Sequence, residues 1–66
     1  MGKFQVDQVW EKDGEIRIII EVTKNFIKFK WWYGFDGMVS TAVDSDAIGI
    51  WNKWAQKAKC TYPISQ

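Results

Sequence analysis

Three turn signals divide the first two-thirds of this 66-residue chain into runs that are rich in β-branched and aromatic residues. The signals are Lys12-Asp13-Gly14, Lys24-Asn25 and Phe35-Asp36-Gly37. Short polar or glycine-containing segments between such runs are typical of β-hairpins. The sequence therefore predicts a meander of four antiparallel strands, over residues 3–11, 15–23, 26–34 and 38–43.

The first hairpin has two candidate registers, which send opposite sets of side chains to a given face of the sheet. A two-residue loop at Asp13-Gly14 sets Val6 opposite Glu21. A three-residue loop, with Gly14 in the left-handed conformation and a bulge, sets Val6 opposite Ile20 instead. The longer loop matches apolar residues with apolar residues, so we favour it.

The second hairpin fits a two-residue loop on both faces of the sheet. This loop sets Ile18 opposite Trp31 on one face and Glu21 beside Lys28 on the other, a favourable cross-strand pair. With a three-residue loop before strand four, the registers direct one set of apolar side chains to a common inner face. That predicted inner face consists of Phe4, Val6, Trp10, Ile16, Ile18, Ile20, Val22, Ile27, Phe29, Trp31, Tyr33, Val39 and Val43.

Apolar residues recur at three- and four-residue spacing after strand four, which is typical of a helix with one apolar side. Asp44-Ser45-Asp46 precede them, and these residue types favour helix N-caps. We predict a helix over residues 46–59 that packs on the inner face, followed by a tail over residues 60–66. The fold class is then α+β, a four-stranded antiparallel meander with one C-terminal helix on one face. Residues 1–66 are expected to form a single domain.

The composition suits a small and densely packed domain. Five Trp, four Phe and two Tyr supply large rings for a core. Cys60 is the only cysteine and histidine is absent, so we expect no disulfide, no metal and no cofactor. The net charge of +1 is neither strongly basic, as in many nucleic-acid binders, nor strongly acidic, as in a DNA mimic. With no targeting or membrane-spanning segment, we expect a cytoplasmic protein.

The residues that enzymes use are either missing or explained by structure. General acid–base chemistry most often uses histidine, which this chain lacks. Cys60 has no histidine to activate it as a nucleophile. Asp44 and Asp46 could bind a hard cation, but we interpret them as helix caps. We therefore expect a binding protein and no enzyme.

The sheet face opposite the predicted helix holds the candidate binding site. It is expected to combine basic side chains with a tryptophan and several aliphatic groups, more apolar area than a solvated face requires. A purely solvated face, on which long basic side chains cover a few apolar groups, is the alternative. The candidate site consists of Val9, Arg17, Ile19, Lys28, Lys30, Trp32 and Met38.

Two functions compete for this face. The first is a protein–protein interaction module, which could be an inhibitor, an adaptor or a subunit that associates with itself as a homodimer. Trp32 beside Arg17 favours it, since these residue types dominate interface hot spots. Small accessory proteins of the kind that bacteriophages encode would fit this description. The second is single-stranded DNA or RNA binding, with Lys28 and Lys30 on phosphates and Trp32 stacked on a base.

The order of elements over residues 3–59, four antiparallel strands and then a helix, resembles the transcriptional-coactivator family of single-stranded DNA-binding proteins. The resemblance lies in topology and assigns no site residue. It implies a dimer with a grooved sheet, and it adds weight to the nucleic-acid hypothesis.

Overall fold

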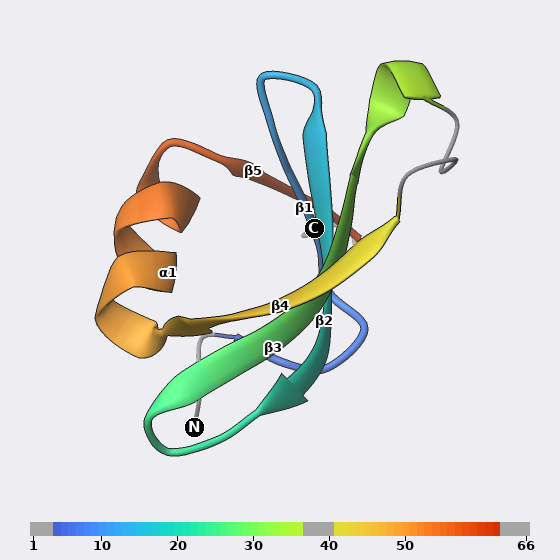
Figure 1. The fold of residues 1–66 in the computed structure, drawn as a ribbon. Helices are drawn as coiled ribbons and strands as arrows, with labels where there is room; N and C mark the ends of the chain where they lie inside the picture. Colours follow the sequence, from blue (N-terminus) through green and yellow to red (C-terminus); the bar gives the residue numbers. More distant parts are fainter. Residues whose placement is uncertain (1–3, 37–40, 63–66) are drawn as a thin grey trace.

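The computed structural model describes residues 4–36 and 41–62 and has an α+β fold (Figure 1). Its antiparallel sheet has five strands, four of them in a meander, with one helix packed on it, which confirms the predicted fold class. The elements in chain order are β1 (Val9–Lys12), β2 (Glu15–Val22), β3 (Phe26–Tyr33), the short 3-10 helix η1 (Gly34–Asp36), β4 (Ala42–Ala47), α1 (Ile48–Gln56) and β5 (Lys59–Tyr62).

The strands lie in the order β4-β3-β2-β1-β5, and each neighbouring pair is antiparallel. The chain leaves β4 at one edge of the sheet, passes through α1 on one face, and returns as β5 at the other edge (Figure 1). β5 occupies part of the segment that was predicted to be a tail. The predicted order of four strands and a helix therefore omitted one edge strand.

The first hairpin has the shorter of the two candidate loops. Lys12 pairs with Glu15 across a turn in which Asp13 and Gly14 have φ angles of 52° and 87°. Positive φ at both central residues is the geometry of the type I′ turn, which Asp-Gly favours because its twist matches that of the strands. The predicted three-residue loop is wrong, and Val9 pairs with Ile18.

A bulge between Ile19 and Glu21 divides the second hairpin into two registers. Near the turn, Glu21 pairs with Lys28 as predicted. Beyond the bulge, the register shifts by one residue, so that Ile18 pairs with Lys30 and not with Trp31. A one-residue shift sends each side chain to the other face of the sheet. The side chains of residues 15–19, on the side of the bulge away from the turn, therefore point to the face opposite the predicted one.

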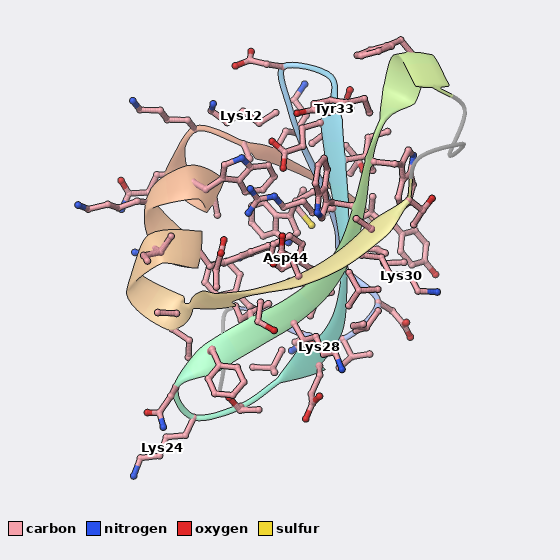
Figure 2. The ribbon with its side chains drawn as sticks, in the orientation of Figure 1. Lys12, Lys24, Lys28, Lys30, Tyr33 and Asp44 are labelled. Carbon is pink, nitrogen blue, oxygen red and sulfur yellow. The ribbon has the colours of Figure 1, made fainter. Side chains whose placement is uncertain are left out.

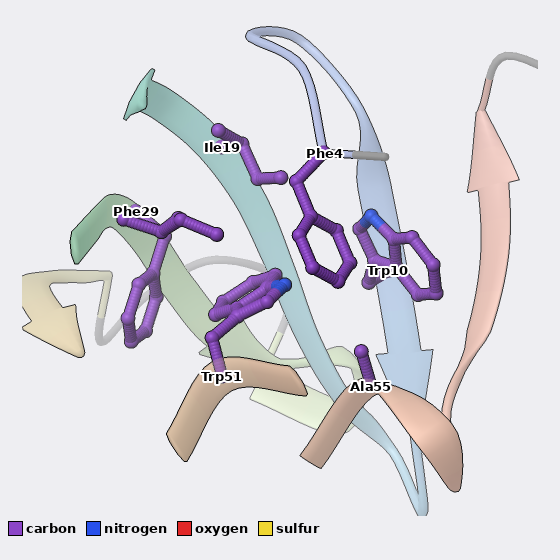
Figure 3. Packing of buried hydrophobic residues seen from close by; sticks show 7 residues of the cluster. Phe4, Trp10, Ile19, Phe29, Trp51 and Ala55 are labelled. Atoms are coloured by element: carbon purple, nitrogen blue, oxygen red, sulfur yellow. The ribbon is translucent and has the colours of Figure 1, made fainter. Parts of the chain in front are cut away.

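The buried core lies between α1 and the sheet face that it covers (Figure 3). Trp51 of α1 is fully buried, and its ring lies 5.0 Å from that of Phe29 and 6.1 Å from that of Phe4. Phe4 also makes an edge contact with Trp10 at 5.6 Å. The buried cluster consists of Phe4, Trp10, Ile19, Ile27, Phe29, Trp51 and Ala55. All of it lies on the helix side of the sheet.

The helix starts later than predicted because the predicted caps belong to a strand. Asp44-Ser45-Asp46 lie within β4, paired with β3, so the cap prediction is wrong. The N-cap position is Ala47, which makes no side-chain cap hydrogen bond. The Ile48 N–H instead donates to the Asn25 carbonyl oxygen at 3.0 Å, which ties the start of α1 to the β2–β3 turn.

Candidate functional site

One face of the sheet carries α1, and no described element covers the other face, which we term the open face. Since paired residues on antiparallel strands point to the same side, the registers identify which side chains it presents. The open face consists of Val9, Glu11, Ile16, Ile18, Glu21, Phe26, Lys28, Lys30, Trp32, Val43, Ser45, Ala47, Lys59 and Tyr62.

A row of paired residues crosses the open face through all five strands. It runs in the order Val43, Lys30, Ile18, Val9 and Tyr62. The central aliphatic residues are half-buried, whereas Val43 and Tyr62 at the two edges are 53% and 59% exposed. Four of the five members are apolar or aromatic, so the row is largely apolar, with Lys30 separating Val43 from the other three. We term this row the apolar strip.

Charged residues flank this row on both sides. On one side Ile16 lies between Trp32 and Glu11, and Glu11 pairs in turn with Lys59. On the other side Glu21 lies opposite Lys28; Figure 2 shows the ammonium groups of Lys28 and Lys30 extending from β3. None of the ion pairs within 4 Å among the described residues involves an open-face side chain. The face thus has a mixed charge pattern around an apolar strip.

The structure brings together four of the predicted site residues and separates two. Val9, Lys28, Lys30 and Trp32 share the open face. Met38 lies outside the described residues. The predicted placement of the other two, Arg17 and Ile19, is wrong because the short first turn and the bulge in β2 reverse that part of the strand. In their place the open face gains Ile16, Ile18 and Val43, which were predicted to face the helix.

Ile19 and Arg17 belong to the helix side of the sheet. Ile19 has no exposed surface. The side chain of Arg17 is only 13% exposed, and its guanidinium carbon lies 4.6 Å from the Phe29 ring, 5.2 Å from Trp51 and 3.9 Å from Trp54. Stacking on aromatic rings is a favourable environment for a guanidinium group. Arg17 is therefore part of the packing between sheet and helix.

Two carboxylates complete the surroundings of this guanidinium group. Arg17 Nε donates to Glu15 Oε2 at 2.7 Å, and Nη1 donates to Asp46 Oδ2 at 3.2 Å. Asp46 was predicted to cap the helix, and the structure instead gives it this ion pair across three strands. A largely buried cation with paired carboxylates satisfies the rule that charges taken from water must be compensated.

Outside the open face, three aromatic residues, Trp31, Tyr33 and Phe35, lie next to one another at the end of β3. Trp31 makes an edge contact with Tyr33 at 5.4 Å, and Tyr33 stacks on Phe35 at 5.4 Å with the rings inclined by 19°. Phe35 is 83% exposed. Figure 2 places Lys12 toward the same end of the molecule as Tyr33. Lys12 is one of the residues that line an open hollow of about 500 Å³, which carries both charge signs. Its lining consists of Glu11, Lys12, Asp13, Gly14, Lys57, Ala58 and Lys59.

Within the described ranges, no three or more His, Cys, Asp and Glu side chains are grouped so as to hold a metal ion. The same residues contain no helix with the length and apolar character needed to cross a membrane. Comparison with protein-family models, with curated proteins and with solved structures finds no match to this chain. The site must therefore be interpreted from its own geometry and chemistry.

Proposed function

We propose that this protein is a non-catalytic protein-binding module that acts through the open face. The observation that supports this role most strongly is the row from Val43 to Tyr62, which is apolar or aromatic in four of its five strands and which no described element covers. Antiparallel sheets with one solvated face normally alternate apolar-in and polar-out residues. β2 breaks that alternation, because Ile16 and Ile18 are directed away from the core.

The character of the open face fits a protein partner. Apolar residues at the centre with charged residues at the rim is the usual anatomy of a protein–protein interface. Trp32 lies next to this centre, and tryptophan is enriched among the residues that dominate binding energy. The partner would be bound in the cytoplasm, where the Cys60 thiol stays reduced. An inhibitor, an adaptor and a self-associating subunit would each use such a face.

Photo-cross-linking tests this proposal with a matched pair of positions. Val43 on the open face is 53% exposed, and Ile50 on α1 is 62% exposed, so the two differ in face more than in accessibility. A photoreactive amino acid is placed at each position in turn, the protein is irradiated in cells, and adducts are identified by mass spectrometry. We expect discrete protein adducts from position 43 only. Adducts from position 50 alone would refute the proposal.

Single-stranded nucleic acid is the second candidate, and one observation favours it. Lys28, Lys30 and Trp32 alternate along β3 and all face outward, which would let two ammonium groups follow phosphates while the indole stacks on a base. The carboxylates of Glu11 and Glu21 on the same face oppose this function, since they repel a phosphate backbone.

A titration separates the two candidates. A short single-stranded oligonucleotide is added at low and at moderate salt while tryptophan fluorescence is followed. Nucleic-acid binding would quench the fluorescence in a manner that requires Trp32 and weakens steeply with salt. We expect no quenching at low salt, because the protein-binding role does not require nucleic acid.

A further inference from the structure

We infer that the partner of the open face is a second copy of this chain, packed sheet against sheet about a two-fold axis that runs along β2. This inference rests on the proposed function and adds the identity of the partner. It follows from three features of the described residues. The buried core lies on one side of the sheet only. A two-fold rotation about β2 sets each apolar residue at one end of the five-strand row against an apolar or aromatic residue at the other end. The same rotation brings Lys30 of the row close to Glu11.

The fold resembles one half of a sandwich. In β-sandwiches two sheets pack face to face at about 10 Å, each contributing the apolar side chains of its inner face. Here the seven residues of the buried cluster lie on the helix side, and the opposite side keeps the apolar strip. Domains of this size usually gain stability from disulfides, metals or association. Cys60 is the only cysteine, so no disulfide can form within the chain.

The dimensions of the molecule allow an interface of ordinary size. Its principal extents are 33, 28 and 19 Å, so it is flat, as expected for one helix layer on one sheet layer. A stable interface buries roughly 800 Å² on each partner. The broad side of a molecule with these extents can supply that area.

A two-fold axis along β2 gives each member of the row a suitable partner. β2 is the central strand, so this rotation places β3 of one copy over β1 of the other and β4 over β5. Ile18 then meets its own copy at the centre of the interface. At the edges Val43 meets Tyr62, so the exposed aliphatic and aromatic members of the row cover each other.

Within the row, the charge pattern favours this axis over the other two-fold axis in the plane of the face. An axis along β2 also sets Glu21 near its own copy, outside the row, where each Glu21 is paired with Lys28 on the neighbouring strand. An axis across the strands through the row would place β3 over β3, so that Lys30 would meet the Lys30 of the other copy. An axis along β2 places Lys30 over Val9 of β1. Glu11 is two residues from Val9 along β1 and points to the same face, so its carboxylate is within reach of the Lys30 side chain of the other copy. The two copies then form two equivalent Lys30–Glu11 contacts.

A charge exchange tests this arrangement. The molar mass of the purified full chain is measured by analytical ultracentrifugation from micromolar to millimolar concentration, and the dissociation constant of the dimer is obtained. Lys30→Glu places like charges near Glu11, and Glu11→Lys places like charges near Lys30. We expect each single substitution to weaken the dimer about tenfold, and the double substitution to return it to within about threefold of the wild type.

Ile18→Glu and Ile50→Glu provide a second, matched comparison. Ile18→Glu brings two carboxylates together on the axis and should abolish the dimer, whereas Ile50→Glu on the exposed side of α1 should leave the dissociation constant unchanged. Circular dichroism establishes that each variant is folded. Equal weakening by both variants would overturn the inference, as would charge substitutions whose effects add without rescue.

The outcomes separate this inference from the proposed function. A wild-type chain that remains monomeric at millimolar concentration, together with adducts to a different protein from position 43, overturns the homodimer and leaves the open face as a binding surface. Adducts from position 50 alone overturn both. Self-adducts from position 43 that join residue 43 to β5 of the second copy support both.

Discussion

The guanidinium carbon of Arg17 lies 3.9 Å from the centroid of a Trp54 ring, so a charged residue of the sheet is covered by the helix. The guanidinium group also forms ion pairs with two carboxylates of the sheet, from Nε to Glu15 Oε2 at 2.7 Å and from Nη1 to Asp46 Oδ2 at 3.2 Å. The three charged side chains are between 13% and 26% exposed. Together with the rings of Phe29 and Trp51, they link β2, β3 and β4 of the sheet to α1.

Arg17→Ala should destabilise the protein by about 2–3 kcal/mol. Removing one partner of a mostly buried ion pair leaves the other charge uncompensated, which costs about 3–5 kcal/mol when the pair is fully buried. Glu15 and Asp46 keep some access to water, so a smaller cost is expected. Urea denaturation measures the change.

The control for this prediction removes all three charges together. Arg17→Met combined with Glu15→Gln and Asp46→Asn keeps the volumes similar and leaves no unpaired charge. This triple variant should be more stable than Arg17→Ala. An Arg17→Ala variant within about 0.5 kcal/mol of the wild type, the range of ordinary surface substitutions, would contradict the described environment of Arg17.

Ile19→Ala and Ile18→Ala test the register of β2, because neighbouring isoleucines point to opposite faces. Ile19 has no exposed surface, so its truncation should cost about 2–5 kcal/mol, as for other buried isoleucines. Ile18 is half-buried on the open face, and its truncation should cost about 1 kcal/mol. Both are measured by urea denaturation at low micromolar concentration, where association contributes least. A larger loss of stability for Ile18→Ala than for Ile19→Ala would contradict this register and favour the three-residue first loop.

Gly14→Ala and Gly49→Ala should change stability in opposite directions. A methyl group at either position meets no atom within 4 Å, so backbone conformation decides the outcome. Gly14 has a φ of 87°, where alanine is strained by about 1–2 kcal/mol. Gly49 lies within α1, where alanine is favoured by about 0.5–1 kcal/mol. The melting temperatures of the two variants should lie on opposite sides of the wild type; a fall for both would refute the assignment of residue 49 to a regular helix.

The sequence was sufficient for the meander and the helix, because turn residues and helical spacing are local signals. It was not sufficient for the registers. β2 contains Ile16, Ile18, Ile19 and Ile20, so apolar residues are available to both faces and alternation alone cannot choose between them. The preference for matching every apolar residue led to the longer first loop. The Asp-Gly pair at residues 13 and 14 was the more informative signal, since it favours a two-residue type I′ turn.

The candidate site was predicted in part for the same reason. β3 has polar residues on one face and apolar residues on the other near its start, so Lys28 and Lys30 were correctly placed outward, with Trp32 following in alternation. Arg17 was misplaced because the register chosen for the first hairpin sent it to the open face, whereas the two-residue turn pairs it with Trp10 on the helix side. Its burial depends on Asp46 and on the rings of α1, partners that are distant in sequence and become visible only in the fold.

The position of β5 was missed because the strand is short and follows the helix directly. Residues 59–62 contain one aromatic side chain, Tyr62, and no aliphatic one, so they give no strong strand signal. In the structure Cys60 pairs with Trp10 and packs against the core, while Tyr62 pairs with Val9 on the open face. Edge strands of this length depend on their neighbour for stability.

The indole N–H signals of the five tryptophans test most directly whether the open face is the binding surface. Trp32 lies on that face, whereas Trp10, Trp31, Trp51 and Trp54 lie on the helix side or in the helix. In ¹⁵N-labelled protein, raising the concentration of the chain, or adding the cross-linked partner, should shift or broaden the Trp32 indole signal and leave that of Trp51 unchanged. A Trp32 signal that stays fixed while the Trp54 or Trp31 signal moves on binding would contradict the proposed site.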